Sequence, residues 1–273
     1  MKIKLGMFLI LTAYQHVLAS SIGCYPVMIC ELIRELGVNA EEIDLTPQIK
    51  GDPHHYKLTT KDLKQIIKMP IYITGPIELW TPSEKINSLR PSKNLKTLVL
   101  KFNEDYQALA PRFGNNRHAL SHFWLYPKIH CHAREQVYQF LSQLKKLPPP
   151  TNCPYQLNEA NMAKLKNKFA QAHFVFSHDA LVPLFLAYGL KANALNSSSH
   201  NGHHQIDLAK NLSKRSPNEK FIWIIEKSIQ EPHLFKKRFQ QHNDLHIEIN
   251  TLGQLGQKVR PLDELIQKLE ALP

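Results

Sequence analysis

Glycine, closely spaced cysteines and long apolar runs are all scarce in this sequence. Only 10 of the 273 residues are glycine, and neither G-x-x-x-x-G-K-[ST] nor G-x-G-x-x-G occurs, which argues against a glycine-rich loop for nucleotide phosphates. The four cysteines form no C-x-x-C pair, so a structural zinc site built on cysteine is not expected. No H-E-x-x-H occurs, so the helical motif typical of zinc hydrolases is missing as well.

Histidine and positive charge are in excess. The chain has 15 histidines, and 34 Lys and Arg against 23 Asp and Glu give a net charge of +11. The hydrophobic share of 43% is typical of a folded protein, and the length allows two lobes with a core each. The basic residues are spread out and form no stripe interleaved with aromatic residues, so no nucleic-acid partner is expected.

The first 19 residues have the pattern of a secretory signal peptide. Lys2 and Lys4 precede an apolar run over residues 5–13, and small residues at Val17 and Ala19 suit cleavage near Ala19. A buried N-terminal helix is the alternative. The run is too short to span a bilayer and no other run approaches that length, so we expect a periplasmic protein without an integral membrane span.

The four cysteines would all remain after this cleavage. Disulfides are permitted in an oxidising compartment, but spacing alone does not choose the pairing of Cys24, Cys30, Cys131 and Cys153. Lipidation of Cys24 is a weaker alternative, because the usual leucine three positions before it is missing.

Strand-like and helical patterns alternate along the chain, which predicts an α/β fold with parallel sheets. Proline at positions 148–150 predicts a joint between two lobes. We therefore expect a signal peptide (1–19), an N-terminal lobe (20–147), a proline-rich joint with a connecting helix (148–172) and a C-terminal lobe (173–273). The expected strands are 20–25, 42–45, 69–74, 96–102, 173–177, 220–226 and 245–249; the expected helices are 27–36, 60–67, 127–146, 158–170, 180–188, 231–241 and 261–272.

Three histidines fall in loops or turns beside these elements. His54 follows the strand at 42–45, His122 precedes the helix at 127–146, and His178 lies between the strand at 173–177 and the next helix. Imidazole is the commonest zinc ligand among side chains, and ligands bind parallel sheets at their carboxyl edges and between lobes. Each histidine alone could instead bond a backbone carbonyl, but together they indicate a metal site between the lobes.

Four segments resemble the metal-specific solute-binding proteins of zinc and manganese ABC transporters. These segments are Asp52–Pro53–His54–His55–Tyr56, His122–Phe123–Trp124–Leu125, Ser177–His178–Asp179–Ala180 with Tyr188–Gly189–Leu190, and the strand that ends at Glu226. The resemblance extends over nearly the whole mature chain. It implies two lobes, a metal held between them, and delivery of that metal to a membrane permease.

The resemblance also implies which residues hold the metal. The ligand role carries over to His54, His122 and His178, and Asn250 stands where the family has an aspartate. The fourth position therefore falls to Asn250 or water, or to a carboxylate such as Glu226 or Asp179, which could alternatively orient an imidazole. Three imidazoles favour Zn²⁺ over Mn²⁺.

The remaining histidines have weaker interpretations. His200, His203 and His204 lie in a polar loop that could be an auxiliary metal loop or simply solvated. His130 and His132 are two residues apart on a predicted helix, do not face one another, and are expected at the surface.

The sequence thus predicts an exported, monomeric, non-enzymatic protein that captures Zn²⁺ and delivers it to an ABC permease. A periplasmic metal buffer or chaperone without a transporter is one alternative. A zinc-dependent hydrolase that uses the same histidines with an open fourth position is the other.

Overall fold

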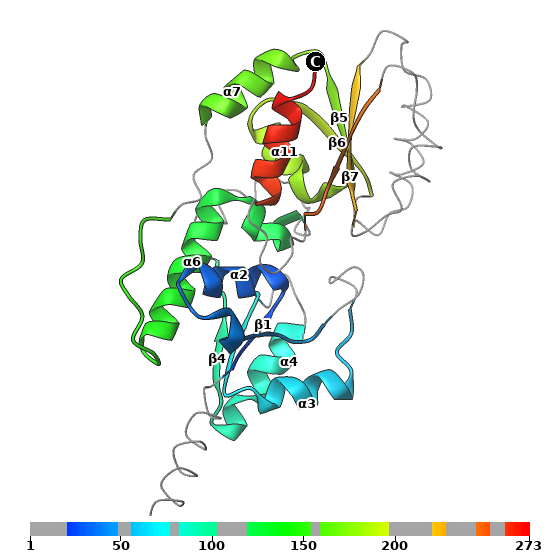
Figure 1. The fold of residues 1–273 in the computed structure, drawn as a ribbon. Helices are drawn as coiled ribbons and strands as arrows, with labels where there is room; N and C mark the ends of the chain where they lie inside the picture. Colours follow the sequence, from blue (N-terminus) through cyan, green and yellow to red (C-terminus); the bar gives the residue numbers. More distant parts are fainter. Residues whose placement is uncertain are drawn as a thin grey trace, which may run out of the picture.

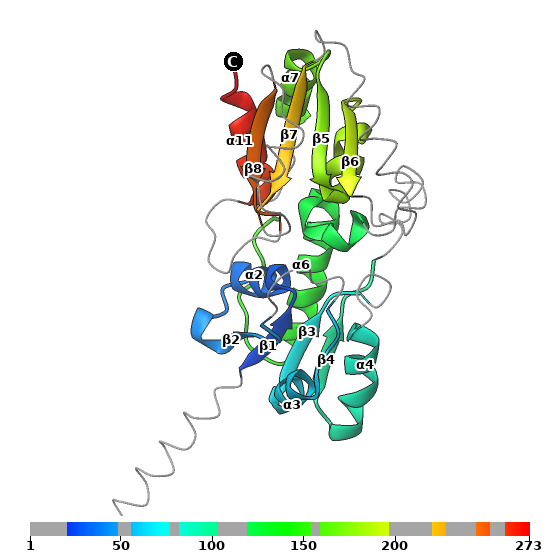
Figure 2. The same ribbon diagram turned by 90° about the vertical axis from the view of Figure 1, so that its right-hand side faces the viewer.

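The structure is a computed structural model of the chain that describes residues 21–48, 56–76, 82–102, 119–153, 159–196, 220–227, 244–251 and 260–273. These residues form two α/β lobes, one above the other in Figures 1 and 2. Each lobe contains one parallel sheet flanked by helices, which confirms the expected fold class. The predicted signal peptide, His54 and the loop with His200, His203 and His204 lie outside the described residues.

The first lobe is built on a four-stranded sheet in the order β2-β1-β3-β4, with all neighbours parallel. All four residues of β1 and of β3 are buried, as is typical of parallel strands covered on both faces. Helices flank this sheet (Figure 2). The elements are β1 (Ile22–Tyr25), α2 (Val27–Glu35), η1 (Ala40–Glu42), β2 (Ile43–Leu45), α3 (Thr60–Lys68), β3 (Ile71–Thr74), α4 (Pro82–Leu89), η3 (Pro91–Lys93) and β4 (Lys96–Val99).

The second lobe repeats this plan with the strand order β6-β5-β7-β8. Its central strand β7 is buried at all six positions. In Figure 2 the arrowheads of β5 and β6 point toward the first lobe, so the carboxyl edge of this sheet faces the junction. The elements are α7 (Glu159–Lys168), β5 (His173–His178), η6 (Asp179–Leu181), α8 (Val182–Ala187), β6 (Lys191–Asn196), β7 (Phe221–Glu226), β8 (Leu245–Ile249) and α11 (Pro261–Glu270).

The junction between the lobes contains η5 (Ala119–Leu125) and the 16-residue helix α6 (Pro127–Ser142). Helix α6 packs against α2 and η5 (Figure 1). Within the expected joint, α7 packs against α11, where Lys168 donates hydrogen bonds to the carbonyls of Glu270 and Leu272. The domain ranges themselves remain predictions.

All four cysteines are paired, as Cys24–Cys30 and Cys131–Cys153. The first disulfide ties the end of β1 to α2, and the second ties α6 to the segment that follows it. The structure thereby gives the pairing of the cysteines, which their spacing in the sequence does not determine.

Strand β6 and helix α4 do not appear among the elements expected from sequence. The sequence of β6 is Lys-Ala-Asn-Ala-Leu-Asn, and both alanine and asparagine have low strand propensity. The strand is therefore stabilised by its pairing with β5 rather than by its local sequence.

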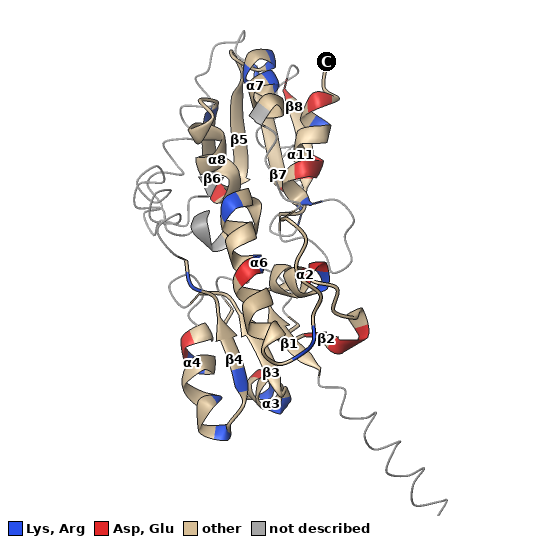
Figure 3. Cartoon of the chain, turned by 90° about the vertical axis from the view of Figure 1, so that its left-hand side faces the viewer, with Lys and Arg blue, Asp and Glu red and all other residues tan. Residues whose placement is uncertain are grey.

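Charged residues are interspersed rather than segregated in the view of Figure 3, where Lys and Arg alternate with Asp and Glu over helices of both lobes. Of the described helices, none combines the length and the apolar character that a membrane crossing requires.

Candidate metal site

Two of the three predicted metal ligands meet at the junction. His178 is the last residue of β5 and His122 lies in η5, where its φ of −97° and ψ of 40° interrupt the helical turn. Their ring centroids are 4.9 Å apart and the rings meet edge-on, with an interplanar angle of 69°. The exposed fraction is 0% for His122 and 5% for His178, so both imidazoles are withdrawn from water.

Two carboxylates flank the His178 ring. Oε1 of Glu226 lies 3.3 Å from its Nδ1, and Oδ1 of Asp179 lies 3.5 Å from its Nε2. Both acids are buried, with exposed fractions of 2% and 1%. A carboxylate beside one ring nitrogen can orient a metal-binding imidazole. With Glu226 in that role at Nδ1, the nitrogen that could face a cation is Nε2, on the side of Asp179.

Glu226 is itself fixed by neighbouring strands. It ends β7, which lies beside β5, and its backbone N–H donates to Oγ of Ser177 at 2.9 Å. The hydroxyl of Thr251, just beyond β8, donates to its other carboxylate oxygen, Oε2. Three strand ends therefore hold this buried carboxylate against His178.

Two further hydrogen bonds attach the His122 segment to the second lobe. Nε1 of Trp124 donates to the carbonyl of Thr251 at 2.8 Å, and the Tyr126 hydroxyl donates to the carbonyl of Ala180 at 2.8 Å. Thr251 therefore bonds both to Trp124, two residues after His122, and to Glu226, the carboxylate beside His178.

The other predicted site residues are placed unequally. Asn250 comes directly after β8, at the same sheet edge as Glu226 and next to Thr251. His54, His200, His203 and His204 fall outside the described residues. Among the side chains that the structure does describe, no group of three or more His, Cys, Asp and Glu residues is arranged to hold a metal ion.

The sequence did not reveal the supporting role of three residues beside the site. They are Ser177, Trp124 and Thr251, which lie one or two residues from His178, His122 and Asn250 in sequence. This closeness to the predicted ligands is the signal that could have found them. Their hydrogen-bond partners could not be found in this way, because the Trp124–Thr251 bond spans 127 residues of sequence.

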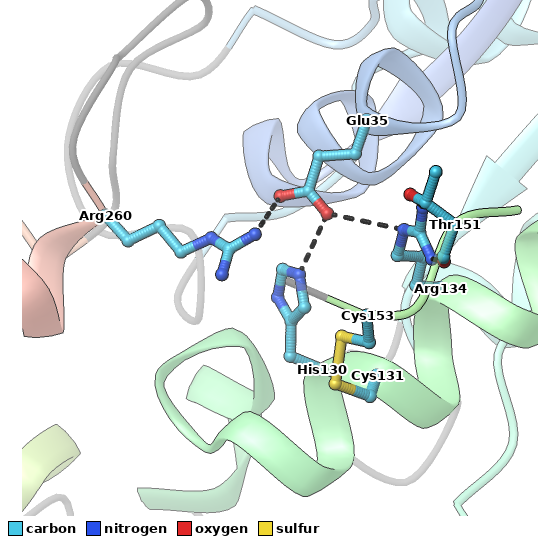
Figure 4. The surroundings of a disulfide bond; sticks show 7 residues. All are labelled: Glu35, His130, Cys131, Arg134, Thr151, Cys153 and Arg260. Atoms are coloured by element: carbon cyan, nitrogen blue, oxygen red, sulfur yellow. Dashed lines mark hydrogen bonds and ion pairs between the residues drawn. A yellow bond between two sulfur atoms is a disulfide. The ribbon is translucent and has the colours of Figure 1, made fainter. Parts of the chain in front are cut away.

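The expectation that His130 lies at the surface is wrong. Its exposed fraction is 0%, and its Nε2 lies 3.2 Å from Oε2 of Glu35, at the end of α2 (Figure 4). A separation of two residues on a helix shows only that His130 and His132 do not face each other. It could not show that α6 turns His130 toward α2.

No protein-family model matches the sequence, and no curated protein matches it either. Solved structures do match in fold. The AdcAII protein of Streptococcus pneumoniae has a TM-score of 0.63 at 14% identity over 93% of this chain and 98% of that one. The periplasmic zinc binding protein TroA from Treponema pallidum has a TM-score of 0.59 at 19% identity, over 92% and 98% of the chains.

A third solved structure, described as the metal-dependent lipoprotein YcdH from Bacillus subtilis, has a TM-score of 0.57 at 15% identity over 92% of this chain and 97% of that one. These similarities extend over nearly the full length of all the chains compared. The chain therefore has the two-lobed fold of these three solved proteins, of which TroA is described as a zinc binding protein and YcdH as a metal-dependent lipoprotein.

Proposed function

We propose that this protein is a non-enzymatic, exported metal-binding protein that captures Zn²⁺ between its lobes and delivers it to an ABC permease. One observation carries the proposal: His122 and His178, from different parts of the chain, bring their rings to 4.9 Å of one another at the junction, with a buried carboxylate beside them. The likeness in fold to TroA, which is described as a periplasmic zinc binding protein, supports it.

In this proposal His54, His122 and His178 supply imidazole nitrogens to the metal. Zinc accepts neutral histidine in tetrahedral sites, and a ligand set dominated by imidazole suits zinc better than manganese, which prefers oxygen. Since the ligands come from separate segments, binding would hold these segments together and stabilise the closed arrangement.

The negative charge of the site comes from Glu226 and Asp179 rather than from position 250. Asparagine there is neutral, whereas Glu226 lies 3.3 Å from Nδ1 of His178 and is held by Thr251. We propose that Glu226 orients the His178 imidazole and offsets the charge of the bound cation, leaving Asn250 or a water molecule for the fourth position.

Zinc affinity tests the ligand assignment. His54→Ala, His122→Ala and His178→Ala should each lower the affinity measured by competition with a chromophoric chelator by at least about 10-fold, and the His122→Ala/His178→Ala double variant should lose stoichiometric binding. His132→Ala is the matched control. His132 is a half-buried residue of α6, and the variant should bind zinc as the wild type does. Unchanged affinity in the double variant would contradict the assignment.

Delivery to a permease needs a cellular measurement. Uptake of labelled zinc should fall in cells that lack this protein and recover with the wild-type chain but not with the double variant. Unchanged uptake, together with intact zinc binding by the purified protein, would favour the buffer or chaperone alternative.

A further inference from the structure

A cluster of charged side chains lies between the lobes, apart from the two histidines of the site. Its centre is Glu35, the last residue of α2, with Arg260 on one side and His130 and Arg134 of α6 on the other (Figure 4). We call these four residues the interlobe clamp. Arg260 and Glu35 are 225 residues apart in sequence, and they belong to the second and the first lobe.

Both carboxylate oxygens of Glu35 are used in this cluster. Oε1 accepts a hydrogen bond from Nη2 of Arg260 at 2.9 Å. Oε2 lies 3.2 Å from Nε2 of His130 and 3.8 Å from Nε of Arg134. The Glu35 side chain is only 21% exposed and that of Arg260 20%, so solvent screens this pair less than it screens a pair at the surface.

The first-lobe half of the clamp is also held by contacts that do not involve Arg260. Nη1 of Arg134 donates to the carbonyl of Thr151 at 2.9 Å, and the Cys131–Cys153 disulfide fixes that segment to α6 beside His130. A preorganised acceptor loses little conformational entropy when its partner binds, so the contact with Arg260 is stronger than one between two free side chains.

The second-lobe half connects to the metal site through packed elements. Arg260 is the N-cap of α11, and α11 packs against β8. Just beyond β8 is Thr251, which binds both Glu226 and the Trp124 indole. The second lobe is thus attached to the α2–α6 side of the molecule at two separate places. One is the group of contacts at the histidines, and the other is the Arg260–Glu35 contact. Two attachments fix the angle between the lobes, which one attachment would leave free.

We propose that the Arg260–Glu35 contact is a positioning device that holds the lobes at the angle at which His122 meets His178, and thereby slows release of the bound metal. The part that concerns release rests on the proposed function, whereas the coupling between the lobes does not. Glu35 and Arg260 are positioning residues, since neither touches the histidines of the site. Losing the contact lets the lobes separate more often and exposes the site to water.

The first test measures zinc release by stopped-flow mixing with excess chelator. Glu35→Gln and Arg260→Met should each raise the dissociation rate constant by roughly 5- to 10-fold with a small change in the association rate constant, because contacts of this kind act mainly on dissociation. Arg260→Lys, which keeps the charge, should recover most of the wild-type rate constant.

Glu31→Gln is the matched control. Glu31 lies on the same helix and pairs with Arg34 at 2.7 Å within that helix, so Glu31→Gln removes an equal charge from α2 while leaving Glu35 in place. It should leave zinc release unchanged. Wild-type release from folded Glu35→Gln and Arg260→Met proteins would overturn the proposal, as would an equal acceleration in Glu31→Gln.

The second test uses the metal-free protein, so that it stands apart from zinc binding. In a double-variant cycle on the thermal unfolding midpoint, Glu35→Gln and Arg260→Met should each lower the midpoint, and the double variant should lower it by no more than the larger single effect. If the two single effects on the unfolding midpoint add fully in the double variant, Glu35 and Arg260 are not coupled and the proposal is overturned. If the wild-type protein binds no zinc, the proposed function fails, but this cycle still decides whether the lobes are coupled.

Discussion

At the scale of single residues, the environment of His178 decides what its imidazole can do. A buried histidine between two buried carboxylates is a strong candidate for a cation ligand, because the carboxylates orient the ring and offset positive charge. Glu226 and Asp179 provide this environment at 3.3 Å and 3.5 Å. Asn250, where the resembled family has an acid, adds no negative charge.

Substitution of Glu226 tests whether this residue, rather than Asn250, supplies negative charge beside His178. Glu226→Gln keeps the size of the side chain and can still accept from Thr251, but it removes the charge, so zinc affinity should fall by about 10- to 100-fold with the stoichiometry unchanged. Isothermal titration with zinc and a competing chelator measures both quantities. Asn250→Asp in the Glu226→Gln background supplies a carboxylate at the neighbouring strand end and should recover part of the affinity. Wild-type affinity in Glu226→Gln would remove Glu226 from the site.

At the scale of elements, helix α3 begins with a capping box. The Thr59 hydroxyl accepts from the backbone N–H of Asp62 at 3.2 Å, and the Asp62 carboxylate accepts from the backbone N–H of Thr59 at 2.8 Å. The Tyr56 hydroxyl donates to the same carboxylate at 2.6 Å. Burial would raise the pKa of Asp62, but the hydrogen bonds from Thr59 and Tyr56 outweigh it and lower the pKa below its usual value.

Loss of this cap should have a measurable cost. Thr59→Ala removes the hydroxyl that bonds the first turn and should lower the free energy of unfolding by about 1 kcal/mol, as measured by urea denaturation. Ser88→Ala is the control, because the Ser88 hydroxyl donates to an exposed carbonyl within its own helix, α4, and its loss should change stability by less than about 0.5 kcal/mol. Equal effects of the two substitutions would count against the cap.

At the scale of the whole molecule, the lobes are joined by polar contacts that cross between them. Glu35 carries the charge of one such contact. Burial would raise the pKa of its carboxyl, but the hydrogen bond from His130 and the charges of His130 and Arg260 outweigh burial and lower the pKa. Asp263, in the first turn of α11, behaves oppositely: burial raises its pKa, while Arg260 and His130 pull it down less strongly.

These directions predict how stability depends on pH. A carboxyl whose pKa is lowered by folding stabilises the protein above its ordinary value of 4.5, and this contribution is lost as the pH falls through the folded-state pKa. The raised pKa of Asp263 acts in the opposite sense, and His130, Arg134 and Arg260 also face Glu35. The comparison with Glu35→Gln isolates the contribution of Glu35.

Unfolding midpoints of the wild type and Glu35→Gln should therefore differ most above pH 4.5 and converge as the solution is made more acidic. A series of thermal denaturations in buffers of constant ionic strength measures the difference. A gap between the two proteins that is constant with pH, or that widens in acid, would contradict the assigned role of the Glu35 charge.

The sequence by itself determined what depends on local pattern. Alternating apolar strands and amphipathic helices specified two parallel α/β lobes, and the ends of the buried strands placed His178 and Glu226 at the carboxyl edge of one sheet. These features follow from periodicity over about ten residues, because burial of strand and helix faces requires it.

Only the tertiary structure decided which distant groups meet. The cysteine pairing, the contact of His178 with Glu226, and the contacts of Glu35 with His130 and Arg260 all join segments far apart in the chain. A local pattern shows that a side chain lies on one face of an element but not which element covers that face. That choice is made when the lobes pack, since burying a charged group is favourable only where packing also supplies its partner.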